Sequence, residues 1–498
     1  MSRVRGAGPN TGMVTRESRS HPRSTQEQKL ATSGTSETSE TCDIRDHIVS
    51  SIYRRAEAIA RRVVQRADNT SPWDQRLDDI LTSRLWGYPV MLLLLGIVFW
   101  ITLSGANYPS QALASLLFGI EARLSGLCMR LGAPDWLHGF LIFGVYRAVA
   151  WVVSVMLPPM AIFFPCFTLL EDLGYLPRVA FNLDSLFKRA GTHGKQALTM
   201  SMGFGCNAAG VIACRIIDSP RERLIAILTN NFVPCNGRFP LLITLATIFM
   251  GRMGETTASA VEPVDSGVQA ACGSTAAAAA VVVGLVLVGI VITLLVSWFL
   301  SRTILRGVPS SFTLELPPYR KPQVGRILLR SLIDRTAFVL QRAVTVAAPA
   351  GGITWVLANT YIQGQSIIAH TAALIEPFGR ALGLDGFIIM AFILGLPANE
   401  IVLPILLMSY LSAGKMLEVE SLEALRALLV EGHGWTWLTA LSMMLFSLLH
   451  FPCGTTLWTI RKETGSTKWA LAAAALPLAV ASGVCFSITW ATRLFGLP

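Results

Sequence analysis

Charged residues are scarce in this chain. They make up 14% of its 498 residues, whereas hydrophobic residues make up 52%, and a soluble domain carries about 25% charged residues. This scarcity argues against an ordinary soluble domain and predicts a polytopic membrane protein. The formal net charge of +10 does not indicate nucleic-acid binding, because the arginines cluster in short segments beside apolar spans, as they do in cytoplasmic loops.

Several sequence motifs are also missing. The nine cysteines include no Cys-x-x-Cys pair, which argues against a structural zinc site, and most lie in or beside apolar spans rather than in a disulfide-rich region. The N-terminal segment has no apolar core and does not resemble a signal peptide. Neither Gly194-Lys195 nor Gly414-Lys415 is followed by Ser or Thr. We therefore expect no GTP or other nucleotide site on this chain.

The long apolar segments predict an all-α membrane protein with about 8–10 transmembrane or re-entrant segments. Its N-terminus is expected in the cytoplasm. The predicted order is a disordered cytoplasmic tail (1–42), a cytoplasmic amphipathic helical region (43–86), a first span and external loop (87–138), a first repeat (139–250), an external loop and scaffold span (251–301), a cytoplasmic connection (302–342), a second repeat (343–468) and a last span (469–498).

Helix-breaking residues interrupt the apolar segments at several places. Gly203 and Gly205 lie in one segment, and Pro234 lies in the next. Pro397 and Pro452 interrupt two segments later in the chain. Glycine frees the backbone and proline removes a hydrogen-bond donor. Paired interruptions of this kind mark substrate sites in transporters that contain broken helices.

The interrupted segments form an internal repeat. Four short stretches of the first half resemble four of the second half in the same order: 146–149 and 341–344, 186–191 and 377–382, 203–208 and 395–400, 232–235 and 450–453. The sequence therefore predicts two structural repeats, each with two broken segments. If the four breaks meet at one depth, they form a single site at the interface between the repeats.

The breaks carry side chains that suit a metal ion. The candidate ligands are three thiols, two amides and one carboxylate: Cys206, Cys235, Cys453, Asn207, Asn399 and Glu400. Backbone carbonyls next to the prolines would add oxygen ligands. A mixed sulfur and oxygen set suits a borderline divalent metal such as Fe(II) better than Na⁺ or Mg²⁺. A conducting site must also release its ion, so incomplete ligation is expected.

Other interpretations of these residues remain open at this point. A buried cysteine often serves as a small hydrophobic residue, Asn207 and Asn399 can cap half-helices, and Glu400 can pair with a buried donor. The alternative functions are a carrier of nucleosides or another small solute, and a non-transporting membrane scaffold. A thiol enzyme is disfavoured, because no histidine lies near Cys206 or Cys235 in the sequence.

Two groups of motifs resemble the ferrous iron transport protein B (FeoB) family. The stretches 203–207 and 232–240, with the arginines between them, resemble its first gate motif, and 174–181 also resembles the family. The stretch 461–470 is similar to the segment before the last span of that family. The resemblance covers roughly 44–495. It implies Fe²⁺ as the transported substrate, passage across the cytoplasmic (inner) membrane, no enzyme activity, and an iron path that includes Cys206 and Cys235.

The chain also departs from the family pattern. The family normally begins with a G-protein domain and a helical coupling domain, and only residues near 44–84 resemble the end of the latter. The second gate reads Pro397-Ala398-Asn399-Glu400, where the commoner family pattern has a lysine before the glutamate. Asn236-Gly237 follow Pro234-Cys235 where the family more often has serine and alanine. The resemblance implies the lipid bilayer, a separate GTPase subunit, a small Feo-type accessory protein and a homo-oligomer as partners.

Overall fold

The computed structural model describes residues 51–59, 78–83, 86–192, 194–250, 267–307, 324–325, 329, 336–412, 414–416 and 422–496. The chain divides into two units, 1–71 and 72–498. The first unit contributes one described helix, 51–59, on which Ile52, Tyr53 and Ile59 are exposed. The expected tail, and most of the expected loops between 251 and 342, lie outside the described residues.

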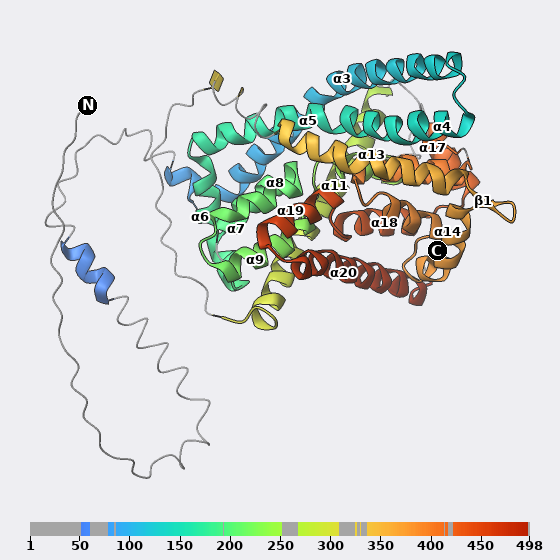
Figure 1. The fold of residues 1–498 in the computed structure, drawn as a ribbon. Coiled ribbons are helices and arrows are strands. Elements are labelled where there is room, and N and C mark those ends of the chain that lie inside the picture. Colours follow the sequence, from blue (N-terminus) through green and yellow to red (C-terminus); the bar gives the residue numbers. More distant parts are fainter. Residues whose placement is uncertain are drawn as a thin grey trace, which may run out of the picture. The chain divides into compact units, whose positions relative to one another are not determined.

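The second unit begins with two long helical segments. They comprise α3 (Gly87–Arg130), α4 (Asp135–His138), the π-helix η1 (Gly139–Tyr146) and α5 (Arg147–Asp172). Helix α3 packs along α5 (Figure 1). The sequence predicts an external loop within 87–138, but the structure has a helix here that continues past Pro109 to Arg130. Packing against a neighbouring helix outweighs the local preference of a single proline.

The first repeat continues with short helices. They are α6 (Tyr175–Arg189), α7 (Lys195–Gly205), α8 (Asn207–Ala213), η2 (Cys214–Ile216), α9 (Pro220–Thr229), η3 (Asn230–Phe232) and α10 (Phe239–Met250). Helix α11 (Gly267–Arg302) follows as one apolar segment and packs against α10. The predicted scaffold span is therefore a continuous helix. Gly205 and Pro234 lie where helices of the first repeat are separated, whereas Gly203 lies inside α7.

The second repeat has the same alternation of helix and break. Its elements are α13 (Phe338–Asn359), β1 (Tyr361–Ile362), β2 (Gln365–Ser366), α14 (Ile367–Ala381), α15 (Gly386–Leu394), η5 (Asn399–Ile401), α16 (Val402–Tyr410), α17 (Leu422–Arg426), the π-helix η6 (Ala427–Gly432), α18 (Trp437–Leu449), α19 (Gly454–Thr464) and α20 (Thr467–Leu494). Asp385 and Thr436 cap the first turns of α15 and α18 with their side chains.

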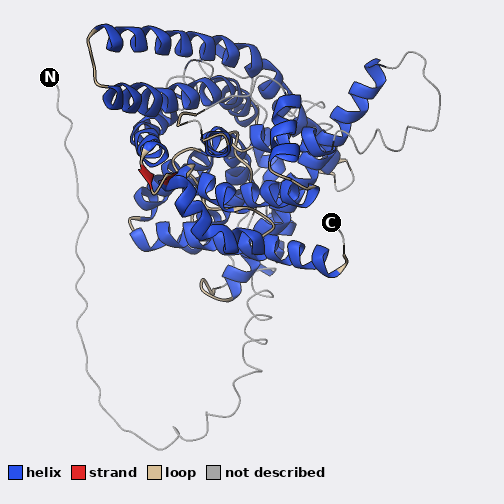
Figure 2. Ribbon diagram, turned by 90° about the vertical axis from the view of Figure 1, so that its right-hand side faces the viewer, coloured by secondary structure: helices blue, strands red, loops and turns tan. Residues whose placement is uncertain are grey.

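The two short strands form one antiparallel hairpin, and the rest of the regular structure among the described residues is helical (Figure 2). The described helices include five that are long and apolar enough to cross a membrane: Tyr108–Arg130, Asp135–Asp172, Ala278–Arg302, Trp437–Thr464 and Thr467–Leu494. A sixth candidate is the pair Ile367–Ala381 and Gly386–Leu394, which is bent by 110°. The predicted all-α, multi-pass membrane fold is confirmed.

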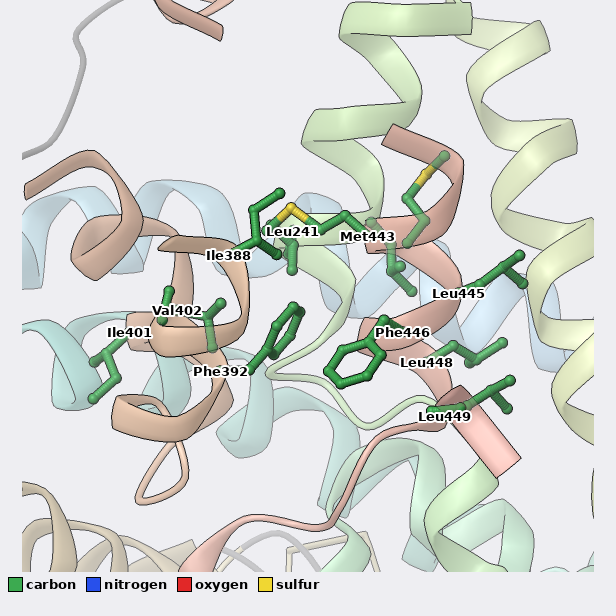
Figure 3. Packing of buried hydrophobic residues seen from close by; sticks show 14 of the residues in the cluster. Leu241, Ile388, Phe392, Ile401, Val402, Met443, Leu445, Phe446, Leu448 and Leu449 are labelled. Carbon is green, nitrogen blue, oxygen red and sulfur yellow. The ribbon is translucent and has the colours of Figure 1, made fainter. Parts of the chain in front are cut away.

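Residues from both repeats share one large hydrophobic core. Figure 3 shows the rings of Phe392 on α15 and Phe446 on α18 close together, and their centroids are 5.0 Å apart. Leu241 on α10 belongs to the same cluster. Since α10 belongs to the first repeat and α15 and α18 to the second, the breaks between these helices are held in fixed relative positions by close packing.

Candidate functional site

The first break of the first repeat lies at Cys206, between α7 and α8. Its backbone is extended, with φ −153° and ψ 124°, so one residue separates the two half-helices. Two glycines precede it for steric reasons. A Cβ at Gly205 would overlap the Phe163 ring, and one at Gly203 would lie 2.8 Å from Oδ1 of Asn230. The two glycines therefore allow neighbouring side chains to approach the broken backbone closely.

The first break of the second repeat lies at Ala398. Its φ of −152° and ψ of 124° nearly repeat the values of Cys206, the residue with which it aligns. Asn207 begins the half-helix after one break, and Asn399 begins the 3₁₀ turn after the other. The local geometry thus supports the internal repeat, and Glu400 takes the place that a small alanine holds in the first repeat.

The second breaks lie at Cys235, between η3 and α10, and at Cys453, which is the N-cap of α19. The amide of Asn236 donates to the carbonyl of Gly205 at 3.3 Å. In the second repeat, the amide of Gly454 donates to the carbonyl of Leu396 at 2.6 Å. In each repeat a backbone hydrogen bond therefore connects the second break to the first, so the breaks of a repeat cannot move independently without losing it.

The four breaks surround one small cavity of about 30 Å³. All six candidate ligands line it, together with Gly205 and Pro397, whereas Gly203, Pro234 and Pro452 do not. A cavity needs at least about 10–15 Å³ to hold one water molecule. The cavity in this conformation therefore accommodates a particle of roughly the size of one water molecule or ion.

The two repeats interlock at this cavity. Nδ2 of Asn399 lies 3.9 Å from Sγ of Cys235, which comes from the other repeat. Gly237 packs directly against the carboxylate of Glu400, so closely that a Cβ at Gly237 would overlap Oε1. A side chain larger than that of glycine at position 237 would therefore displace the Glu400 carboxylate from the position it takes here.

Several oxygen and sulfur atoms that could bind a metal ion at the cavity have no strong partner among the described residues. Oδ1 of Asn207 is buried and accepts no hydrogen bond from the described residues, while Nδ2 of the same side chain donates to Oδ1 of Asn231 at 3.2 Å. Within the described part of the chain, no cation forms an ion pair with Glu400. Sγ of Cys453 lies 3.3 Å from Oγ1 of Thr456. The cavity wall therefore offers oxygen and sulfur atoms to a bound particle.

These side chains do not form a closed metal cage. Among the residues that the structure describes, no group of three or more His, Cys, Asp or Glu side chains is arranged to hold a metal ion. An ion at the cavity would therefore need the amide oxygens, backbone oxygens or water in addition to the thiols and Glu400. A weak site of this kind resembles a transport site more than a structural one.

A buried arginine supports the wall behind the cavity. Arg238 has no exposed surface, and its guanidinium donates to the carbonyls of Leu448, His450, Phe451 and Asn231 and to Oδ1 of Asn231, over distances of 2.7–3.3 Å. Nδ2 of Asn231 also donates to the carbonyl of His450 at 2.6 Å. This network ties the second break of the first repeat to the second break of the other.

The arginine network changes one expectation about the site. The sequence predicts that carbonyls near Pro452 serve as extra oxygen ligands, but the carbonyls of His450 and Phe451 already accept hydrogen bonds from Arg238. In the sequence, Arg238 is recognisable as a charged residue within an apolar segment. Its partners in the second repeat lie 210 to 213 positions away in the sequence, so sequence alone gives no means to identify them.

Two methionines at the cavity were not predicted. Met156 and Met160 lie one turn apart on α5, and both line the cavity. Thioether sulfur is a soft ligand, so these side chains extend the sulfur-containing wall. The sequence gives no signal for this role, because methionine in an apolar helix is indistinguishable from an ordinary core residue.

Comparison with known protein families gives two matches. The family model "Gate: Nucleoside recognition" matches residues 153–254, which include α8 and the Cys206 and Cys235 breaks. The model "Ferrous iron transport protein B C terminus" matches residues 282–334. No solved structure matches the chain.

The curated relatives are iron transporters. The Fe(2+) transporter FeoB of Staphylococcus aureus is 28% identical over 91% of this chain and 63% of its own length. The Fe(2+) transporter FeoB of Methanocaldococcus jannaschii is 26% identical over 89% of this chain and 62% of its own length. The chain thus spans about three fifths of the length of these relatives. Together, the family models and the relatives show that the chain is similar to the membrane part of FeoB proteins.

Proposed function

We propose that this chain carries Fe²⁺ across the cytoplasmic membrane through the cavity at its helix breaks. This proposal rests on one observation: thiol, amide and carboxylate groups from both repeats line the same cavity. Similar proteins are described as Fe(2+) transporters, which supports iron as the substrate. In this proposal, Cys206, Cys235 and Glu400 contact the ion.

The chemistry of the cavity suits the passage of a borderline cation. Thiol and thioether sulfur favour softer metals, whereas carboxylate and amide oxygen favour harder ones. A wall that contains both types binds Fe²⁺ with moderate strength and also allows its release. Cys453, Asn207 and Asn399 complete the proposed set of ligands, with backbone oxygen or water filling the remaining positions.

A nucleoside carrier is the second candidate, because the description of one matched family model mentions nucleoside recognition. The cavity argues against it, since a volume of about 30 Å³ is far below the 300–1,000 Å³ typical of sites for larger ligands. A nucleoside would require a much wider conformation. Competition of uptake by an excess of nucleosides distinguishes the two functions.

The proposed transport function also implies partner proteins. One relative, from Porphyromonas gingivalis, is a fusion of Fe(2+) transport protein A with Fe(2+) transporter FeoB, which supports a FeoA-type accessory protein for this chain. We also propose a separate GTPase subunit that docks on the basic segment 44–66, a homo-oligomeric assembly, and a cytoplasmic N-terminus. Full transport by the chain alone, in a strain without any such GTPase, would refute the GTPase subunit.

The test is uptake of radiolabelled Fe²⁺ under reducing conditions in cells that lack other ferrous importers. Wild type is compared with Cys206→Ser, Cys235→Ser and Glu400→Ala at equal membrane abundance. Cys485→Ser is the matched control, because Cys485 is buried in α20 and does not line the cavity. We expect uptake by wild type and the control, and a loss of roughly tenfold or more in the other variants.

The other outcomes separate the remaining hypotheses. If wild type imports no iron even beside a candidate GTPase, iron transport is wrong, and solute carriage or a scaffold role gains support. If all variants import iron like wild type, transport stands but the site assignment fails. A scaffold would tolerate all of these substitutions without loss of its own assembly.

A further inference from the structure

A second cavity lies where α19 ends and α20 begins, away from the helix breaks. It measures about 740 Å³ and is lined by Leu457, Trp458, Arg461, Lys462, Gly465, Thr467 and Ala470. Gly465 has φ 64°, a left-handed conformation that glycine adopts readily. This turn brings the last turn of α19 beside the first turn of α20, and so places two cationic side chains at the start of the last membrane helix.

Two positively charged side chains line this cavity, and no acidic side chain among its lining residues balances them. Arg461 and Lys462 are exposed, and within the described residues no carboxylate pairs with either of them. The neighbouring Glu463 is already occupied by Arg215, at 2.7 Å. A guanidinium group recognises phosphate oxygens well because its donors form a planar fork. The cavity therefore suits an anionic group, and phosphate chemistry in particular.

The residues around the cavity indicate which class of molecule would supply the phosphate group. Trp458 is 60% exposed and Leu471, just inside α20, is 71% exposed. Leu478 is also exposed and lies two helical turns further along α20. Tryptophan is enriched at the headgroup level of membranes, and an exposed apolar stripe on a membrane helix faces acyl chains. A phospholipid has its phosphate and its acyl chains in this same order.

We propose that this cavity binds the phosphodiester headgroup of an anionic phospholipid. Arg461 and Lys462 hold the phosphate, Trp458 packs beside the glycerol region, and the acyl chains follow the Leu471–Leu478 face of α20. The volume of the cavity exceeds that of a phosphate and falls in the range of sites for larger ligands. Basic pockets at the ends of membrane helices are suited to acidic lipid headgroups. The proposal does not depend on which ion the chain transports.

The test measures lipid retention by the full chain. The protein is purified in detergent, stripped of lipid and exposed to equal amounts of phosphatidylglycerol and phosphatidylcholine, and bound lipid is counted by native mass spectrometry. We expect wild type to retain phosphatidylglycerol preferentially. The double variant Arg461→Gln/Lys462→Gln should retain roughly 30-fold less, since each basic side chain near an anionic lipid contributes about 1 kcal/mol.

Controls separate this site from general electrostatic attraction. Lys468→Gln removes an exposed positive charge from the first turn of α20 at a residue that does not line the cavity, and should leave retention unchanged. Arg461→Lys/Lys462→Arg keeps both charges and should restore preference for the anionic lipid. Equal retention of both lipids by wild type overturns the proposal, as does undiminished retention by the double glutamine variant.

A free phosphate is the alternative source of the same chemistry. Inorganic phosphate is therefore added as a competitor in the wild-type experiment. Displacement of phosphatidylglycerol only by other anionic lipids supports the lipid site. Displacement by inorganic phosphate at comparable concentration overturns it in favour of a soluble anion. None of these measurements involves iron, so their failure is distinguishable from failure of the proposed transport function.

Discussion

Arg215 and Glu463 form a bidentate ion pair that links the two repeats across 248 positions of sequence. Nε and Nη2 of Arg215 each lie 2.7 Å from a carboxylate oxygen of Glu463. Arg215 lies just after α8, and Glu463 lies in the last turn of α19. Both half-helices begin at the cavity, at Cys206 and Cys453, and they pack against each other. The ion pair therefore connects their ends remote from the cavity.

The first prediction concerns this ion pair. Arg215→Ala and Glu463→Gln should each lower Fe²⁺ uptake several-fold, because α8 and α19 then lose the connection between their far ends. The free energy of unfolding should fall by less than about 1 kcal/mol, since Arg215 is 64% exposed and solvent weakens the pair. Uptake and chemical unfolding in detergent check both expectations.

The exchange variant Arg215→Glu/Glu463→Arg provides the control for this prediction. It restores the pair with reversed charges and should recover part of the uptake lost in the single variants. If the single variants transport like wild type, the ion pair has no role in transport. If the exchange variant remains as impaired as the single ones, the effect arises from each residue separately and not from their pairing.

The second prediction concerns Arg238. Arg238→Ala should lower the free energy of unfolding by roughly 3 kcal/mol or more, because each buried acceptor left unpaired costs about 1–3 kcal/mol. Arg238→Lys keeps the charge but cannot reproduce the forked contacts to both breaks, so it should be intermediate. Arg493→Lys, at an exposed arginine that bonds one carbonyl, is the control and should be neutral. If the Arg238 variants unfold at the same denaturant concentration as the wild type, this role of Arg238 is refuted.

The third prediction concerns Gly237. Gly237→Ala should displace the Glu400 carboxylate, because the added methyl group overlaps Oε1. The overlapping atom is the end of a flexible side chain, so we expect a small loss of stability, up to about 1 kcal/mol, together with a marked loss of Fe²⁺ uptake. Gly483→Ala on α20, where an added Cβ meets no atom within 4 Å, is the control. Equal uptake by both variants would show that the position of Glu400 is unimportant.

The positions of the breaks could be predicted from sequence because glycine and proline act locally. Gly205, Pro234, Pro397 and Pro452 mark interruptions that the structure contains. The internal repeat then predicted that the breaks lie close together, since equivalent positions of two repeats meet at their interface. The near-identical backbone of Cys206 and Ala398 supports that argument. The metal-binding role of the residues at the breaks remains a prediction.

Other features depend on contacts between distant residues. Helix α3 continues past Pro109 because it packs along α5, which no local pattern in 104–130 indicates. Three of the carbonyls that accept from Arg238 belong to the second repeat. Every residue has a backbone carbonyl, so the sequence does not indicate which ones are partners. Met156 and Met160 reach the cavity because of the orientation of α5. In each case tertiary packing decides the outcome, and local sequence preference does not.

The last prediction tests the sulfur-containing part of the cavity wall. Met156→Leu/Met160→Leu keeps the volume of both side chains but removes the thioether sulfur, so the loss of stability should stay below about 1.5 kcal/mol. Soft sulfur favours Fe²⁺ over the harder Mn²⁺, and the ratio of Fe²⁺ to Mn²⁺ uptake should therefore fall. Met443→Leu/Met444→Leu changes two buried methionines on α18 that do not line the cavity, and its uptake ratio should equal that of wild type. If both double variants keep the wild-type ratio, the methionines serve only as packing, and discrimination between metals must come from Cys206, Cys235 and Glu400.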